Sequence, residues 1–228
     1  MPPREPSPGG ICPPLPGRVL CLVTDRTLTK GADDLVRAVE AALVGGVNMV
    51  QLREPDQPPD ELRELACRLR HVTRDRALLI VNGDPSLAID VGADGIQVPE
   101  RGMSMREARK LLEPDMLIGR SVHGVTAAMA AEREGADFLI AGTVFPSRSH
   151  PAGPTGGADM IRDVASTVNI PVIGIGGITK NNAAAVVEAG AAGVAVISAI
   201  LGAADPESAS RQLAGAIDLT ATITGEAT

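Results

Sequence analysis

Serine and histidine lie two residues apart in the segment LIGRSVHG, which spans residues 117–124. Its apolar start predicts a buried strand, so Ser121 and His123 fall on one face near the carboxyl end. Imidazole can accept and donate a proton near neutral pH, although a strand-end histidine can also simply bond to a backbone carbonyl. We expect His71 to be a solvated helix residue. The pattern favours His123 as an acid–base catalyst.

Polar side chains also lie toward the ends of three other apolar segments. Gln51 and Arg53 share one face of a predicted strand, Asn82 ends another strand, and Gln97 lies in a third. Polar groups inside apolar strands are costly unless they bind something. Structural roles stay open: Gln97 could hydrogen-bond to another strand, Asn82 could cap a turn, and Glu54 could form an ion pair. Four strand ends together predict one shared site.

Two segments near the C-terminus predict a phosphate site. IGGITKNNAAA follows one predicted strand, and ISAILG ends the next. Gly176 and Gly177 lack a Cβ, so their backbone can approach an anion closely. Ile197 and Ser198 add backbone N–H groups, and the serine adds a hydroxyl. The expected ligand is a small phosphate monoester.

Short apolar segments alternate with helical segments along the chain. The predicted strands span residues 19–25, 49–54, 78–83, 95–100, 116–123, 137–145, 170–177 and 193–200. Strict alternation predicts a parallel sheet with helical crossovers, and eight units predict an α/β fold, a single (β/α)8 TIM barrel. A doubly wound sheet is the alternative, but no GxGxxG motif follows the first strand. In a barrel, the polar strand ends would meet at one face.

A weak internal repeat supports the barrel. GAD at 92–94, GAD at 135–137 and GAAG at 190–193 each close a predicted helix and open a strand. Glycine at such a position permits the left-handed conformation that ends many helices.

Composition limits the classes of protein and partner. The formal charge is −7 and Phe138 and Phe145 are the only aromatic residues, which argues against a nucleic-acid partner. Three cysteines without a CxxC motif argue against a disulfide framework or a thiolate zinc site. The sequence has no apolar run of membrane-spanning length and no hydrophobic signal region, so we expect a cytoplasmic protein. Residues 1–17 are expected to be a proline-rich disordered lead-in, 18–219 the barrel domain, and 220–228 a flexible tail.

Seven segments stand out in order along the chain: QLRE at 51–54, IVNG at 80–83, GADGIQV at 92–98, GRSVH at 119–123, GTVFPSRS at 142–149, IGGIT at 175–179 and VAVISAI at 194–200. Together they resemble the thiamine phosphate synthase superfamily of barrels. The resemblance covers roughly residues 18–204. It implies a small-molecule thiazole phosphate substrate, a homodimer, and no nucleic-acid or membrane partner.

Two kinds of protein make up that superfamily: synthases that join a pyrimidine pyrophosphate to a thiazole phosphate with magnesium, and thiazole tautomerases of the TenI type that need no metal. The synthases carry charged groups where this chain has Pro55, Gly83, Gly102 and His150. The sequence therefore favours a metal-independent thiazole tautomerase, an isomerase with no cofactor, over a synthase with magnesium. A non-catalytic protein that binds thiazole or thiamine phosphate is a further alternative.

The resemblance assigns roles to the residues singled out above. His123 would be the catalytic acid and base, with Arg53 binding the substrate carboxylate or stabilising developing charge and Ser121 orienting the imidazole. The phosphate would lie at Gly176, Gly177, Ile197 and Ser198. The loop after the sixth strand, which contains His150, is long enough to act as a flap. The expected substrate-binding residues are Gln51, Asn82, Gln97, Thr143, Ser147, Ser149 and His150.

Overall fold

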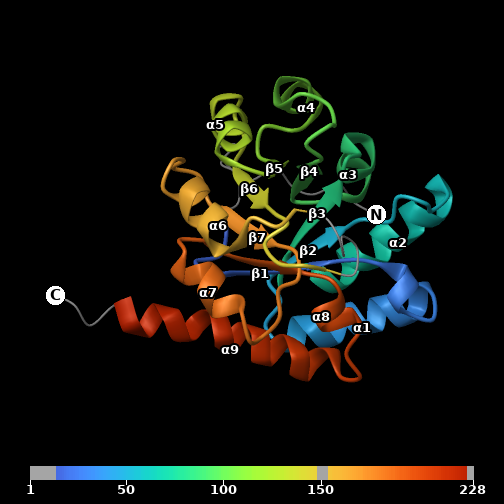
Figure 1. Cartoon of the computed structure of the whole chain (residues 1–228). Coiled ribbons are helices and arrows are strands. Elements are labelled where there is room, and N and C mark those ends of the chain that lie inside the picture. The colour runs from blue at the N-terminus through green and yellow to red at the C-terminus, as the bar shows by residue number, and fades with distance from the viewer. Residues whose placement is uncertain (1–13, 148–153, 225–228) are drawn as a thin grey trace.

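The strands of the computed structural model close into one barrel (Figure 1). Residues 14–147 and 154–224 are described, with side chains up to residue 218. All strand pairs are parallel and follow chain order, and β8 pairs with β1. The strands are β1 (Val19–Val23), β2 (Met49–Leu52), β3 (Leu78–Asn82), β4 (Gly95–Val98), β5 (Leu117–Val122), β6 (Phe138–Ala141), β7 (Val172–Ile175) and β8 (Gly193–Val196). Each lies within its predicted segment, which confirms the (β/α)8 barrel.

Helices surround the barrel on its outside (Figure 1). They are α1 (Ala32–Val44), α2 (Pro59–Thr73), α3 (Pro85–Val91), α4 (Met105–Leu111), α5 (Val125–Arg133), α6 (Gly157–Ala165), α7 (Ala183–Glu188), α8 (Ser198–Leu201) and α9 (Pro206–Thr224), with a short 3-10 turn η1 (Arg26–Leu28). Helix α9 packs across α1 and α7 and runs past the domain boundary predicted at residue 219. Residues 1–13 of the predicted lead-in and 225–228 of the predicted tail lie outside the described residues. Within the described part, no helix has the length and apolar character to cross a membrane.

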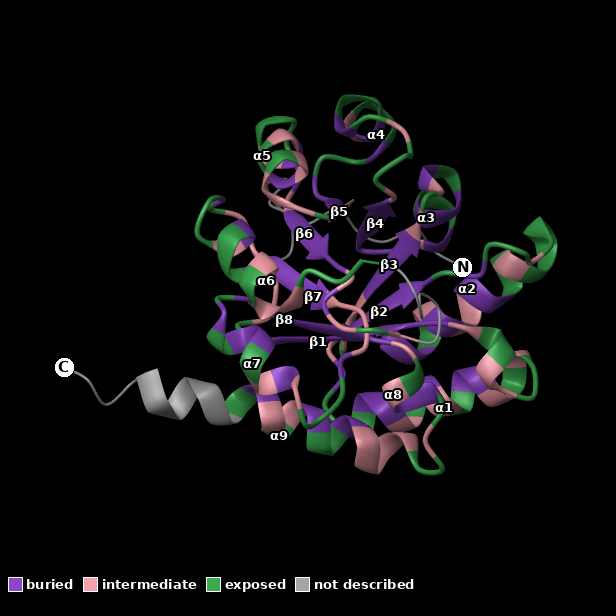
Figure 2. Cartoon of the chain, in the orientation of Figure 1, coloured by how far each residue is buried: buried purple, intermediate pink, exposed green. Residues whose placement is uncertain are grey.

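Two apolar layers account for the core. The outer layer lies between the strands and the helices, so the strands are buried on both faces (Figure 2). The inner layer fills the barrel with side chains at alternate strand positions. It comprises Val19, Cys21, Val23, Met49, Ile80, Leu117, Phe138, Ile140, Ile173 and Ala195.

A glycine makes room for the largest side chain of that inner layer. Phe138 is fully buried, and a Cβ at Gly119 would overlap both its ring and the side-chain oxygen of Gln97. The missing methyl group at residue 119 therefore lets a phenylalanine and a glutamine share one level of the barrel. Above this level the strands carry polar side chains.

The repeated GAD segments anchor neighbouring strands at the opposite end of the barrel. Asp94 accepts hydrogen bonds at 2.8 Å from the backbone N–H of Leu79 and from the guanidinium of Arg70. Asp137 likewise accepts from the N–H of Ile118 at 2.7 Å and from an arginine of α4 at 2.6 Å. Each carboxylate thus ties a strand to a helix. The glycines predicted to be left-handed have positive φ angles at Gly92, Gly135 and Gly190.

Glu54, just after β2, is a buried carboxylate that holds the first loop of the barrel. Both of its oxygens lie 3.1 Å from the donating backbone N–H of Arg26, and the Arg26 Nε lies 3.9 Å from Oε2. The ion-pair role left open for Glu54 is therefore the one observed. Burial raises the pKa of Glu54, although hydrogen bonds from Thr24 and Arg26 oppose the shift.

The raised pKa gives a signed prediction for stability against pH. The pKa of Glu54 in the folded protein is above the ordinary glutamate value of 4.5, so the folded state holds this proton more tightly than the unfolded state does. The free energy of unfolding therefore falls as pH rises from 4.5 through the raised pKa. Glu54→Gln removes this dependence. Urea unfolding across that range should show wild type losing stability relative to Glu54→Gln.

Glu107 provides a control of opposite sign. The Ser104 backbone N–H and hydroxyl lower the pKa of Glu107, so its contribution is present above 4.5 and is lost as pH falls below that value. Glu107→Gln should therefore change the slope of unfolding free energy against pH only below pH 4.5. Parallel curves for wild type and Glu54→Gln above pH 4.5 would contradict the assignment.

Candidate active site

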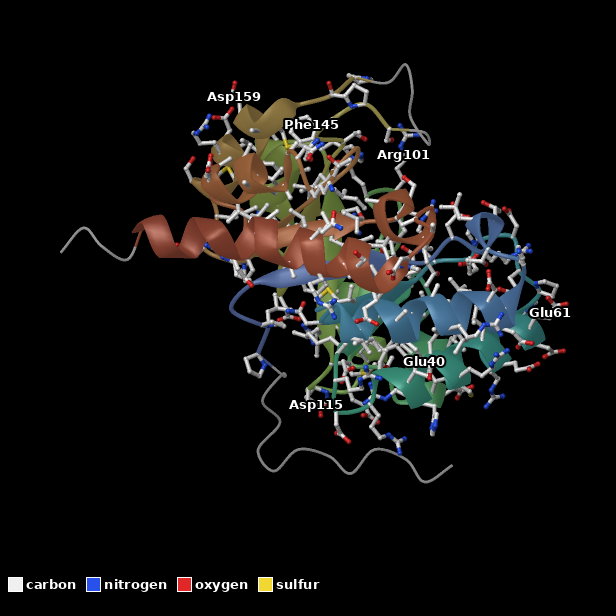
Figure 3. All side chains as sticks on the ribbon, turned by 90° about the horizontal axis from the view of Figure 1, so that it is seen from below. Glu40, Glu61, Arg101, Asp115, Phe145 and Asp159 are labelled. Carbon is white, nitrogen blue, oxygen red and sulfur yellow. The ribbon has the colours of Figure 1, made fainter. Side chains whose placement is uncertain are left out.

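A cavity of about 880 Å³ opens at the carboxyl ends of the strands. It brings together most of the residues that the sequence singled out: Gln51, Arg53, Asn82, Ser121, His123, Thr143, Ser147, Gly176, Gly177, Ile197 and Ser198. Figure 3 shows the barrel from the side, with Phe145 and Arg101 at this end and Asp115 at the other. Parallel strands all present their carboxyl ends to this face, so residues distant in sequence converge here.

A second cavity of about 890 Å³ lies at the opposite end of the barrel, among the loops that precede the strands. Its most buried charged pair is Arg70 and Asp94, which are 2.8 Å apart. These two groups serve the strand anchor described above. The cavity at the carboxyl ends, where polar side chains leave the core, is therefore the better candidate for chemistry.

Amide and hydroxyl groups form the floor of the candidate site. Gln51 is 4% exposed and lines the cavity from β2, and Asn82 lines it from the end of β3. Gln97 does not line it: the side chain is 1% exposed, and its amide donates to the Ser121 hydroxyl at 2.9 Å. The predicted contact between Gln97 and a ligand is corrected, because Gln97 lies one level deeper and supports Ser121 from below.

The imidazole of His123 lies at the cavity wall, directly after β5. Its Nδ1 is 2.6 Å from the Oε2 of Glu100, in the loop between β4 and α4. The Ser121 hydroxyl instead receives the Gln97 amide. The observed polar contact of the imidazole is therefore with Glu100, whereas Ser121 was the residue predicted to orient it. Sequence reasoning missed this contact, because it depends on the conformation of the loop between β4 and α4, which no pattern in the sequence predicts.

Arg120 fastens the loop that carries Glu100. Its guanidinium donates to the backbone carbonyls of Glu100 and Met103, both at 2.8 Å. Arg53, by contrast, is exposed at the cavity rim. Its backbone N–H donates to the Thr24 hydroxyl at 2.9 Å, which ties the loop after β2 to the end of β1. One arginine thus builds the wall, and the other has its side chain exposed at the mouth.

The predicted phosphate end is made largely of backbone. Gly176 and Gly177 have φ angles of 107° and 60°, in the region that favours glycine. The N–H groups of Gly177 and Ser198 donate to no other group in the described part of the chain. Free N–H groups beside a serine hydroxyl suit a phosphate oxygen.

The same glycines also allow two loops to touch. The N–H groups of Val144 and Phe145 donate to the carbonyls of Ile175 and Gly176 at 2.9 and 3.0 Å. A Cβ at Gly177 would overlap the carbonyl of Pro146. The loop after β6 therefore lies against the loop after β7 and brings Thr143 and Ser147 to the cavity. Ser149 and His150, which were predicted to bind substrate, lie outside the described residues.

The described lining of the cavity carries few charges of either sign. Arg53 and His123 are the basic residues of its described lining, and Asp25 and Glu100 are the acidic ones. Asp25 accepts from the Thr27 N–H at 3.0 Å and caps η1. No cluster of three or more metal-ligating side chains was found among residues 14–147 and 154–218.

The sequence and the structure of this chain are similar to those of known proteins. A family model described as thiamine monophosphate synthase matches residues 20–200. A thiamine-phosphate synthase of Roseiflexus sp. (strain RS-1) is 40% identical over 92% of this chain and 91% of its own length. One from Natronomonas pharaonis is 45% identical over 79% of this chain and 86% of its own. A solved thiamine phosphate pyrophosphorylase from Pyrococcus furiosus is 36% identical, covers 90% of this chain and 97% of its own, and superposes with a TM-score of 0.82.

Alanine substitutions at Gly177 and Gly157 should separate the energetic cost of displacing the neighbouring loop from the cost of a left-handed backbone. Gly157 has nearly the same φ, 63°, but nothing lies within 4 Å of a Cβ there. Gly157→Ala should cost about 1 kcal/mol of unfolding free energy from the left-handed backbone alone. Gly177→Ala should cost roughly 1–3 kcal/mol more, because the methyl group displaces the neighbouring loop. Equal losses in urea titrations of the two variants would contradict the loop contact.

Proposed function

Because the chain belongs to the thiamine monophosphate synthase family, we propose that it is a transferase that joins a pyrimidine pyrophosphate to a thiazole phosphate. The observation that carries the proposal is similarity over nearly the whole barrel to proteins named thiamine-phosphate synthase, at 40% and 45% identity. The cavity supports it with a glycine-rich phosphate end and a polar floor. Both features lie at the face where barrel enzymes bind substrates.

The relatives correct the prediction of a thiazole tautomerase. That prediction weighed a few positions, including Pro55, Gly83 and Gly102, more heavily than the chain as a whole. Proteins this similar over most of their length bear the synthase name, which overturns the prediction of an isomerase. The predicted homodimer and cytoplasmic location stay predictions.

The proposed reaction is a displacement at the methylene carbon of the pyrimidine. The thiazole nitrogen forms the new C–N bond, the C–O bond breaks, and pyrophosphate leaves with the bonding electrons. The N–H groups at Gly177 and Ser198 would hold the thiazole phosphate. The amides of Gln51 and Asn82 would hydrogen-bond to the pyrimidine edge. Holding both rings in one cavity makes the displacement effectively unimolecular.

The departing pyrophosphate needs positive charge or N–H donors, since stabilisation of developing charge is usually the largest catalytic contribution. Arg53 at the rim and the His123 imidazole are the basic groups of the described lining. We propose that these two side chains bind the oxygens of the departing pyrophosphate. Both are exposed, so each can meet the pyrophosphate as it enters from solvent.

Magnesium is implied by the resemblance, but the carboxylates near the cavity do not fit it. Asp84 accepts the Leu87 N–H at 2.9 Å and caps α3. Glu100 is engaged with His123. A Cβ at Gly102 would lie 3.0 Å from the Pro99 carbonyl oxygen, so the turn leaves little room for a side chain there. Magnesium requires several oxygen ligands in near-octahedral geometry, whereas Asp25, Asp84 and Glu100 each already contact a protein group.

The mismatch predicts weak binding of divalent cations to the free protein. Titration with Mn²⁺ as a paramagnetic probe should show no saturable site in water proton relaxation. Asp84→Asn should give the same curve, and asparagine keeps the helix cap. A saturable site that is lost in Asp84→Asn would contradict this account.

The proposed activity is tested by supplying the two substrates together. Thiamine phosphate should form with release of one pyrophosphate per turnover. Ser198→Ala should raise KM for thiazole phosphate about fivefold with kcat little changed, because it removes a hydrogen bond worth about 1 kcal/mol.

Ser166→Ala, at the C-cap that follows α6 and outside the cavity lining, is the matched control and should behave as wild type. Tight binding of thiazole phosphate without pyrophosphate release would contradict the synthase and indicate a binding protein. An unchanged KM in Ser198→Ala would place the phosphate elsewhere.

A further inference from the structure

We propose that Glu100 is a positioning residue that fixes the ring of His123 for the reaction. This inference deepens the proposed function and rests on it, because it requires His123 to face the substrate. The contact that suggests it is the 2.6 Å distance between Glu100 Oε2 and His123 Nδ1. Glu100 lies in the loop after β4, and His123 directly follows β5, so the contact links two neighbouring units of the barrel.

The contact selects one tautomer of the imidazole. An ionised carboxylate can only accept hydrogen bonds, so Nδ1 must carry the hydrogen. The hydrogen bond at one ring nitrogen decides the state of the other. Nε2 is therefore the nitrogen available to a ligand in the cavity. In the imidazolium form, its N–H donates to an oxygen of the departing pyrophosphate.

The loop that carries Glu100 is held in place by other contacts. Arg120 binds the carbonyls of Glu100 and Met103, and the N–H of Gly102 donates to the Pro99 carbonyl at 2.8 Å. Because these bonds fix the backbone on both sides of the carboxylate, Glu100 does not depend on His123 for its place. The carboxylate can thus act as a fixed reference for the ring.

The contribution is one of orientation more than of stability. The side chains of His123 and Glu100 are 62% and 38% exposed. Solvated pairs of this kind add little to folding free energy. A reacting group misplaced by about 1 Å can nevertheless slow a reaction about a hundredfold. We therefore expect variants of Glu100 to fold normally and to have a lower kcat.

The tautomer can be read directly by ¹H–¹⁵N NMR of the full chain, without substrate. The His123 signals are assigned by their loss in His123→Asn and are recorded at alkaline pH, raised until the signals no longer change, so that the neutral ring is observed. Wild type should show the Nδ1–H form. Glu100→Ala should shift the population toward the Nε2–H form that dominates in free histidine. Glu100→Gln should restore much of the Nδ1–H form, since its amide oxygen still accepts.

Kinetics then test whether Glu100 acts through His123. Glu100→Ala should lower kcat about tenfold or more, with KM for thiazole phosphate little changed. In the His123→Asn background, Glu100→Ala should cause no further loss, because residues that act as a unit are not additive. Asp56→Asn, which removes an exposed carboxylate next to cavity-lining Pro55, is the matched charge control and should behave as wild type.

Two results would overturn the proposal. An unchanged tautomer in Glu100→Ala would show that the carboxylate does not fix the ring. An equal loss of kcat in the wild-type and His123→Asn backgrounds would show that Glu100 acts independently of the imidazole. If wild type forms no thiamine phosphate, the proposed function fails by itself, and the NMR comparison still decides whether Glu100 orients the ring.

Discussion

In the barrel, β4 and β5 pair so that Gln97 lies opposite Gly119 and Val98 opposite Arg120. A shift of one residue would turn every inward side chain outward, and a closed barrel has no free edge to absorb such a shift. This register places the Gln97 amide beneath Ser121. It also puts Arg120 beside the loop after β4, so the wall of the cavity follows from how two strands are paired.

Much of the architecture is readable from sequence because it depends on repeated local patterns. Apolar segments of strand length alternate with helical ones, and all eight strands lie where this alternation predicts them. Strand ends face one side of a barrel, so His123 and Gly177 could be placed at one cavity without knowing any contact between them. The contact between Glu100 and His123 depends on a loop conformation that two carbonyl–arginine bonds impose, and no periodicity encodes it. The depth of Gln97 likewise depends on the space that Gly119 leaves.

The choice between synthase and tautomerase shows the limit of reading single positions. The resemblance predicted charged groups where this chain has Pro55 and Gly102, and the turn at Gly102 has little room for a carboxylate. Single positions of this kind indicate how an enzyme holds charge during its reaction, but they do not identify the reaction. Similarity across the whole barrel reflects many packed positions at once, and it outweighed the few substitutions.

In the proposed function, the two ends of the cavity bind anions in different ways. At the predicted phosphate end the donors are backbone N–H groups, and the glycine at residue 177 leaves room for the neighbouring loop after β6. At the mouth, the described lining offers one guanidinium and one imidazole, within a chain whose formal charge is −7. Long-range attraction for an anion is therefore weak, and local donors must provide the specificity. Under the proposal, a ring that Glu100 already orients loses less entropy when it meets its ligand, so orientation matters most at the mouth, where the described lining carries few charges.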